Sequence, residues 1–325
     1  MPGPFIHNID PVFGEVGGFY LWWYGLSYTL GSLGLFLWVL LHRESLKMSR
    51  KEVYDLSISV AAGVLIGGRL VEVIFYEWSY YGSHLLHIPA LWLGGMSTHG
   101  ILLGALSGTF LFCRKYRRSF LETADVIVIA GAFIMGVGRL GNFIDGQIVG
   151  RVTDVWWGVK FPDLEGFRHP VVLYDGLKNL LLIPFLLCIR SMEPPRGSIL
   201  AHAILWYGFL RIFVDFFREY RTDLFGFPPG QEFNLFMTFL GLSMLWWFYR
   251  KREVSREKSL RDALVSHRAA DRSCLWARRA IFLLILVLPM IIPSDWTKDV
   301  PEGYSRRHPE ISYSAIYPRI GSPDQ

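Results

Sequence analysis

The chain has 325 residues, of which 52% are hydrophobic, 16% aromatic and 19% charged, and its formal net charge is +5. Soluble domains carry roughly a quarter charged residues, so this composition is typical of a chain that crosses a membrane several times. The basic residues form short clusters between apolar runs, a pattern that fits membrane orientation better than nucleic-acid binding, which needs a continuous basic face. Cys113, Cys188 and Cys274 lie far apart without CxxC spacing, and they indicate neither a disulfide framework nor a zinc site.

Apolar runs long enough to cross a bilayer occur at seven places in the chain. One crossing needs roughly 20 predominantly apolar residues. The predicted spans are 18–41, 57–77, 91–113, 125–145, 171–189, 198–217 and 232–249. An eighth run at 280–292 has thirteen residues and contains Pro289, so it is either a short last span or an interfacial helix. No Lys or Arg precedes the first span, so no cleavable signal peptide is expected, and the sequence predicts an all-α polytopic membrane protein.

The distribution of lysine and arginine predicts the orientation of these spans. Basic clusters follow the first, third, fifth and seventh spans, at 43–51, 114–118, 190–196 and 250–252. By the positive-inside rule these loops lie in the cytoplasm and the N-terminus lies outside. The exceptions are basic residues in two outer loops, namely Arg151, Lys160, Arg168, Arg218 and Arg221.

Composition also divides the chain into three regions. Residues 1–252 form the predicted transmembrane domain, and 253–279 are charged and helix-prone, as expected of a cytoplasmic linker or surface helix. Residues 280–325 combine the short hydrophobic run with a polar tail rich in Pro, Ser and Gly. The tail composition is typical of a loosely ordered segment.

The stretch GRLGNFIDGQIVGR, residues 138–151, places charged and amide side chains at the end of an apolar run. Counting helix rise from the cytoplasmic ends, Arg139 lies roughly 21 Å deep, Arg211 roughly 20 Å, and Arg69 at a similar height. Tyr24 and His99 lie six and eight residues below the outer ends of their spans. Ionised groups in a membrane usually face protein, water or a ligand. We therefore predict one polar cavity that opens toward the outer leaflet, where arginine forks suit an anionic phospholipid.

Each of these residues also has a structural interpretation. Arg139 alone would form an ion pair with Asp215 or Glu72, and His99 would be a helix–helix hydrogen bonder. Tyr24 lies where aromatic belts lie. The glycines of the stretch, Gly138, Gly141, Gly146 and Gly150, serve either close helix packing or close approach to a ligand.

The carboxylates near the span ends also have structural interpretations. Asp175 is placed to neutralise Lys178 on the neighbouring turn. At span ends, Asp175 and Glu219 are expected to be solvated.

At these residues the sequence resembles the prolipoprotein diacylglyceryl transferase family. Besides the 138–151 stretch, five blocks match in the family's order. They are WYGLSY at 23–28, GGRLVEVIFY at 67–76, GGMSTHG at 94–100, RHP with LYD at 168–175, and YGFLRIFVDFFRE at 207–219. The resemblance covers roughly residues 7–250 and is specific because six blocks recur in sequence.

The resemblance implies an enzyme of the bacterial inner membrane with seven transmembrane helices. Such an enzyme moves the diacylglyceryl group of phosphatidylglycerol onto the lipobox cysteine thiol of a preprolipoprotein and releases glycerol 1-phosphate. It needs no metal and no other cofactor. The expected partners are therefore phosphatidylglycerol, lipobox peptides and the membrane itself, with no nucleic acid.

The resemblance also assigns roles to residues by position. The implied catalytic residues are Tyr24, His99, Arg139 and Arg211. Because the thiol needs a base and an imidazole has an unperturbed pKa of about 6.5, His99 is our candidate for that base. The expected phosphatidylglycerol-binding residues are Arg139, Asn142, Gly150 and Tyr207 from the resemblance, together with Arg69 from its depth and Asp215, which we expect to hold an arginine fork.

This chain departs from the family pattern at several positions. Gln147 and Asp215 stand where glutamate is usual, Val171-Val172 replaces a usual Ser-Gln pair, and Asp145 stands where asparagine is frequent. A diverged paralogue with another acceptor is thus one alternative. A lipid-binding or transport protein is a second, although no inverted repeat supports it.

Overall fold

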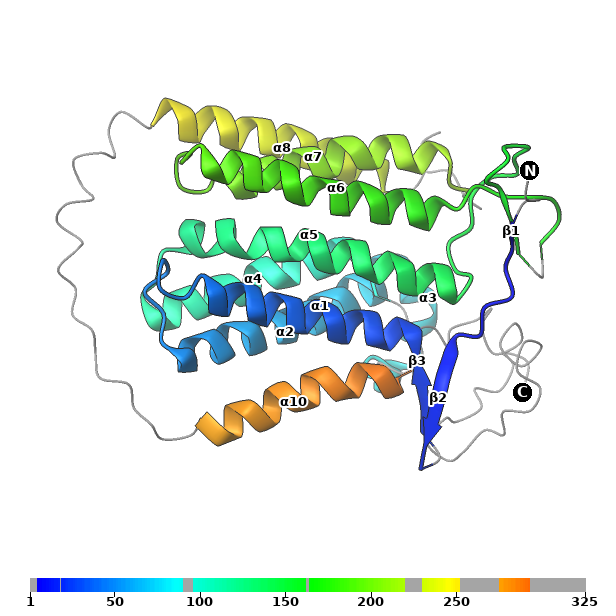
Figure 1. Cartoon of the computed structure of the whole chain (residues 1–325), viewed down its shortest axis with the longest axis horizontal. Helices are drawn as coiled ribbons and strands as arrows, with labels where there is room; N and C mark the ends of the chain where they lie inside the picture. Colours follow the sequence, from blue (N-terminus) through cyan, green and yellow to red (C-terminus); the bar gives the residue numbers. More distant parts are fainter. Residues whose placement is uncertain are drawn as a thin grey trace.

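The computed structural model describes residues 5–17, 19–89, 96–161, 164–219, 230–251 and 275–292, and these form a bundle of long helices (Figure 1). In chain order the long helices are α1 (Trp23–Leu41), α2 (Arg50–Val71), α4 (Thr98–Tyr116), α5 (Phe120–Ile144), α6 (Val171–Ser191), α7 (Ser198–Phe216), α8 (Gln231–Arg250) and α10 (Leu275–Ile291). Shorter helical pieces are a π-helix η1 (Glu72–Tyr76), α3 (Trp78–Tyr81) and a 3₁₀ turn η2 (Leu85–His87).

The strands gather at one end of the bundle, which we call the strand end (Figure 1). There β2 (Val12–Val16) pairs antiparallel with β3 (Phe19–Trp22), and β1 (Phe5–Ile6) pairs parallel with β4 (Val159–Lys160). The His7 imidazole also contacts the Phe143 carbonyl at 2.7 Å. These contacts fasten the start of the chain to the end of α5 and to the loop that follows it.

The predicted spans correspond in order to seven of the long helices, but their boundaries differ. The first span was predicted from residue 18, whereas residues 19–22 form a strand because they pair with β2, and the helix begins at Trp23. The second helix begins at Arg50, seven residues earlier than predicted, because Ser49 and Glu52 form a capping box there. The third begins at Thr98 rather than at 91, and residues 90–95 lie outside the described part of the chain.

Five helices of the described residues are long and apolar enough to cross a membrane, namely α1, α2 with η1, α5, α6 and α7. Of the remaining pair, α4 has 19 residues and α8 has 20, so both are as long as α1. The protein is thus a polytopic all-α membrane protein, while the count of seven spans stays a prediction.

Small residues let two of the helices approach very closely. A Cβ at Gly63 of α2 would lie 2.1 Å from the Gly104 carbonyl oxygen of α4, and a Cβ at Gly104 would lie 2.0 Å from the Gly63 oxygen. Such backbone contact is the usual way in which membrane helices associate without a hydrophobic driving force. The α2–α4 pair is therefore held by close contact between the two backbones, and a larger residue at either glycine would push the helices apart.

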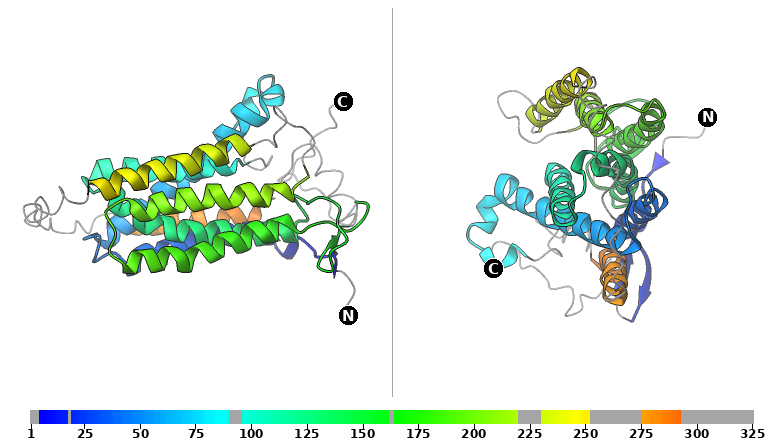
Figure 2. Two further views of the ribbon diagram at one scale, coloured as in Figure 1. Left: turned by 90° about the horizontal axis from the view of Figure 1, so that it is seen from above. Right: turned by 90° about the vertical axis from the view of Figure 1, so that its left-hand side faces the viewer.

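Helix α5 occupies the centre of the bundle and contacts α1, α4, α6 and α7. The end-on view in Figure 2 shows α5 between the α1–α2 side and the α6–α7–α8 side. Outward faces carry exposed apolar side chains such as Leu103, Leu111, Leu181 and Phe239, as expected for surfaces in contact with lipid. This central position explains why α5 can present polar residues to several other helices at once.

Candidate active site

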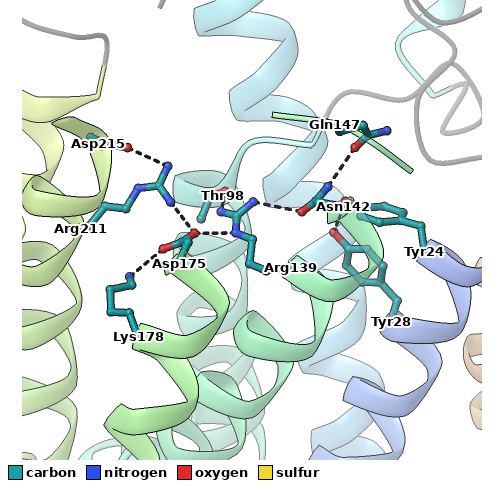
Figure 3. Close-up of polar contacts among 10 residues, drawn as sticks. All are labelled: Tyr24, Tyr28, Thr98, Arg139, Asn142, Gln147, Asp175, Lys178, Arg211 and Asp215. Atoms are coloured by element: carbon teal, nitrogen blue, oxygen red, sulfur yellow. Dashed lines mark hydrogen bonds and ion pairs between the residues drawn. The ribbon is translucent and has the colours of Figure 1, made fainter. Parts of the chain in front are cut away.

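Five buried charged side chains meet near the strand end of the bundle, and we call them the arginine cluster (Figure 3). Its members are Arg139 of α5, Asp175 and Lys178 of α6, and Arg211 and Asp215 of α7. Arg139 and Arg211 each lie five residues before the last residue of their helix, and Asp175 lies four after the first of α6. Both arginines contact Asp175, so they lie at one level as the depth estimate predicted, although α5 begins at Phe120, five residues before the predicted start of its span.

Asp175 is the centre of this cluster. Its carboxylate accepts a hydrogen bond from Arg139 Nε at 2.5 Å and forms ion pairs with Arg211 Nη1 and with Lys178 Nζ, the latter at 3.0 Å. Only 1% of its surface is exposed. The prediction that Asp175 is solvated was therefore wrong, while its predicted pairing with Lys178 is confirmed. Asp175 is the ion-pair partner of Arg139, in place of the predicted Asp215 or Glu72.

The second carboxylate of the cluster fixes Arg211 from the other side. Asp215 Oδ1 lies 3.0 Å from Arg211 Nη2, and the Asn234 amide of α8 donates to Asp215 Oδ2 at 3.0 Å. Asp215 thus holds an arginine fork as expected. Tyr207, also buried, has its ring 3.8 Å from Lys178 Nζ, so a cation–π contact links it to the cluster.

Arg139 continues the network toward the end of α5. Its Nη1 donates to Asn142 Oδ1 at 3.2 Å and its Nη2 to Thr98 Oγ1 at 3.4 Å. Asn142 in turn donates to Gln147 Oε1 at 2.9 Å, so the Gln147 amide supplies the acceptor that a glutamate would supply (Figure 3). The chain makes this return contact because α5 ends at Ile144 and turns through Gly146, which has a φ of +69°.

Tyr24 lies at the start of α1 beside the end of α5. Its hydroxyl forms a hydrogen bond with the Tyr28 hydroxyl at 2.9 Å, and a Cβ added at Gly141 would lie 2.9 Å from Tyr24 Cδ2. Gly141 therefore serves close helix packing. Figure 3 shows Tyr24 and Tyr28 pointing from α1 toward Asn142, and a catalytic role for Tyr24 stays a prediction.

His99 is the second residue of α4, next to Thr98. Its ring packs against Phe233 of α8, with 4.8 Å between the ring centroids. Within the described residues no hydrogen bond engages the imidazole. The described residues therefore give His99 no helix–helix hydrogen bond, and its role as a base stays a prediction.

Arg69 does not contact the arginine cluster, contrary to the prediction from depth. Its guanidinium donates to the Tyr81 hydroxyl at 2.9 Å, to the Ile88 carbonyl at 2.8 Å and to the His87 carbonyl at 3.1 Å. It also lies 4.7 Å from the Tyr81 ring centroid. These contacts hold the end of α3 and the end of η2 against the end of α2, so Arg69 has structural partners of its own.

Gly150 lies in the loop between α5 and α6, where both of its backbone groups have protein partners. Its N–H donates to the His169 carbonyl at 3.1 Å, and its carbonyl accepts from Arg168 Nη1 at 3.3 Å. A Cβ at this position would lie 2.4 Å from the His169 oxygen. The position thus requires glycine, because a side chain would collide with the backbone before α6.

The outer-loop basic residues that break the orientation rule also have partners. Arg168 forms an ion pair with Glu219, Arg151 Nε donates to the Arg218 carbonyl at 3.2 Å, and Lys160 Nζ donates to the Leu164 carbonyl at 2.6 Å. Glu219 keeps half of its side chain exposed, so its expected solvation holds only in part. Arg221 lies outside the described residues. These cations stabilise the loop fold.

A short hydrogen-bonded chain closes the loop over α6. Trp157 Nε1 donates to the Tyr174 hydroxyl at 2.6 Å, and that hydroxyl lies 3.1 Å from His169 Nδ1. Partial burial lowers the pKa of the His169 imidazole, because it disfavours the charged form of the ring. Val171 and Val172, which replace a polar pair, are 1% and 2% exposed and pack beneath this loop.

The charge balance of the arginine cluster determines what it can bind. Three cations face two carboxylates, so these five buried side chains together carry one positive charge in excess. Buried charges without compensation are costly, and arginine forks match phosphate oxygens in geometry. Among the described residues no group of three His, Cys, Asp or Glu side chains is placed to hold a metal ion. The arrangement therefore suits a ligand with one negative charge.

The comparisons with known proteins identify one family over most of the chain. Residues 11–247 match the family model of the prolipoprotein diacylglyceryl transferases. A phosphatidylglycerol–prolipoprotein diacylglyceryl transferase of Geobacter sulfurreducens is 40% identical over 245 residues, which cover 73% of this chain and 94% of the relative. Enzymes of the same name from Nitrosomonas europaea and Vibrio cholerae are each 36% identical, over 78% and 75% of this chain and 98% and 93% of the relatives. The chain belongs to the prolipoprotein diacylglyceryl transferase family.

Proposed function

We propose that this protein transfers the diacylglyceryl group of phosphatidylglycerol to the lipobox cysteine thiol of preprolipoproteins. Membership of the transferase family, with relatives that carry this name, supports the reaction. We place the enzyme in the bacterial inner membrane with the strand end facing outside. The basic clusters at the opposite ends of the spans support this orientation.

The buried excess positive charge of the arginine cluster is the observation that supports the substrate. Phosphatidylglycerol carries one negative charge on its phosphate, which would balance the cluster. Asp175 holds Arg139 and Arg211 on either side of one carboxylate, so that both guanidinium groups lie at the same level. Their remaining donor directions would take the phosphate oxygens, and they would stabilise the negative charge that develops on the leaving group.

The proposed reaction is a substitution at the sn-3 carbon of the diacylglyceryl group. Sulfur forms a bond to this carbon while the carbon–oxygen bond to the phosphate breaks, and glycerol 1-phosphate departs with the bonding electrons. The thiol proton leaves because the thiolate is the nucleophile, and a thiol has a pKa near 8.5 in water, which calls for a base. The His99 imidazole is the candidate base, and Tyr24 is placed at the same end of the bundle to orient the headgroup.

The decisive experiment is mass spectrometry of a lipobox peptide incubated with the purified protein in phosphatidylglycerol-containing vesicles. We expect a diacylglyceryl adduct on the cysteine and one glycerol 1-phosphate released per adduct. Vesicles of phosphatidylcholine alone should give neither product. Phosphatidylglycerol binding without glycerol 1-phosphate release would instead indicate a lipid-binding protein, and it would refute the transferase.

A peptide in which serine replaces the lipobox cysteine distinguishes the diverged-acceptor alternative. Sulfur chemistry predicts no product from this peptide, because a serine hydroxyl is a far weaker nucleophile at neutral pH. Equal modification of both peptides would refute a cysteine-specific transferase.

The variant Arg139→Ala tests the role of the cluster, with Arg190→Ala in the last turn of α6 as a matched control. We expect Arg139→Ala to lose at least about 100-fold in turnover, the scale found for removal of a single transition-state donor. Arg190→Ala should keep activity near that of the parent protein. Parent-like turnover in Arg139→Ala would remove Arg139 from the proposed site.

A further inference from the structure

Helix α10 lies beyond residue 247, where the family match ends, and it packs along the side of α1 (Figure 1). Its sequence alone allows either a short span or an interfacial helix. An interfacial helix lies in the plane of one membrane surface and contacts only the nearest helix ends. A spanning helix must contact its neighbours at both ends, so the positions of its contacts distinguish the two.

The contacts of α10 extend from one end of the bundle to the other. At its start, Arg278 donates to both carboxylate oxygens of Asp55, the sixth residue of α2, at 2.6 and 3.1 Å. Asp55 also accepts the hydroxyl of Tyr116, the last residue of α4. This end lies opposite the strand end.

Midway along α10, the buried Phe282 packs between two aromatic rings. Its centroid lies 4.7 Å from that of Phe36 and 5.8 Å from that of Tyr54. Beyond it, the Thr29 hydroxyl donates to the Leu286 carbonyl at 2.5 Å. Successive contacts therefore advance along α10 while they retreat along α1, so the two helices are antiparallel.

The last contact is made at the strand end. A Cβ on Gly25, the third residue of α1, would lie 1.9 Å from the Pro289 carbonyl oxygen and 2.7 Å from Met290 Cα. Backbone meets backbone here, as it does between α2 and α4. Helix α10 also contacts β3.

The opposite face of α10 is apolar and uncovered within the described residues. Its exposed side chains are Trp276, Ile281, Leu283, Leu284, Val287 and Leu288. The helix of 17 residues is roughly 25 Å long, a few ångströms short of the hydrocarbon core. Mismatch of this size costs only fractions of a kcal/mol per ångström.

We infer that α10 is an eighth transmembrane helix, which covers the α1–α2 face and brings the chain after Ile292 to the side of the membrane that holds the arginine cluster. The inference rests on the contacts of α10 and on the membrane-spanning nature of the bundle. It does not depend on which reaction the cluster performs.

Cysteine accessibility in the full-length protein tests the inference. In a chain with Cys113, Cys188 and Cys274 replaced, Ser322→Cys is compared with two references at opposite ends of the bundle. Trp156→Cys lies in the loop at the strand end, and Met192→Cys follows α6 at the other end, where both native side chains are more than 70% exposed. Labelling by a membrane-impermeant maleimide is measured in intact cells and after permeabilisation.

We expect Ser322→Cys to be labelled under the same condition as Trp156→Cys. Labelling under the condition of Met192→Cys would overturn the inference, because the chain would then return to the side from which α10 begins.

Crosslinking tests the packing independently. Phe36→Cys combined with Phe282→Cys should crosslink with a short bifunctional maleimide. Phe36→Cys with Leu284→Cys, on the exposed face of α10, should not. Equal crosslinking of both pairs, or of neither, would show that α10 does not pack on α1 as described.

Discussion

At the scale of single residues, Asp175 carries most of the organisation of the site. It contacts three cations from three different positions on α5, α6 and α7, and it is almost fully buried. A carboxylate in this setting is stabilised only by its partners, and each partner is stabilised by it. Removing its charge should therefore affect both the fold and the placement of the two arginines.

We expect Asp175→Asn to lower the free energy of unfolding by about 3–5 kcal/mol, because a buried ion pair that loses one partner leaves its cations uncompensated. Thermal unfolding of the protein in detergent micelles would measure the loss. Glu122→Gln is a matched control, since Glu122 pairs with Arg196 where both side chains are more than 40% exposed. Surface pairs contribute about 0–1 kcal/mol, so this control should change little.

The double variant Asp175→Asn/Lys178→Met separates charge balance from loss of the side chain itself. It removes one cation along with the carboxylate charge, which restores the single positive excess of the cluster. We expect it to recover part of the stability lost in Asp175→Asn. Asp175→Asn with parent-like stability would contradict the role given to this carboxylate.

The imidazole of His99 allows a second prediction at this scale. If it removes the thiol proton, His99→Gln should lower the rate of adduct formation at neutral pH by about 10²–10⁴-fold, the usual range for a general base. His202→Gln in α7 is the control, because it replaces a histidine that has no role in the proposed reaction. An unchanged rate and pH profile in His99→Gln would mean that another group or water takes the proton.

At the scale of elements, the α2–α4 pair depends on the absence of side chains along one seam. We expect Gly63→Ala to destabilise the protein by about 1–3 kcal/mol, because its methyl group would enter the backbone of α4. Gly131→Ala in α5 is the matched control, since no atom lies within 4 Å of the added Cβ. Alanine is the better helix former, so the control should be neutral or slightly stabilising. Equal unfolding temperatures for the two variants would show that the packing of α2 on α4 does not require glycine at position 63.

At the scale of the whole molecule, the outcome to test is the orientation in the membrane. Basic loops predict that the strand end faces outside. In cells carrying the cysteine-replaced chain, we expect Trp156→Cys to react with an impermeant maleimide before permeabilisation and Met192→Cys only after it. The reverse pattern would place the arginine cluster on the cytoplasmic side.

Much of this molecule follows from local properties of the chain. Apolar runs identify the long helices because each must satisfy its backbone hydrogen bonds internally within lipid. Helix rise places Arg139 and Arg211 at one level because an α-helix has a constant pitch. The motif blocks, including the stretch around Arg139 and Asn142, identify the family. The pairing of Lys178 with Asp175 also follows from their spacing of three residues.

Only the tertiary structure decided which of these residues meet. Depth alone could not exclude Arg69, since residues at one height can face different neighbours around the bundle, and Arg69 turns to the Tyr81 segment. Asp175 was predicted to be solvated because it lies near a helix end, and nothing local shows that Arg139 of α5 and Arg211 of α7 enclose it. The direction of α10 likewise depends on the distant contacts of Arg278 and Gly25. Sequence determines the elements and their depth, whereas the rotation and neighbours of each helix are set by packing between segments far apart in the chain.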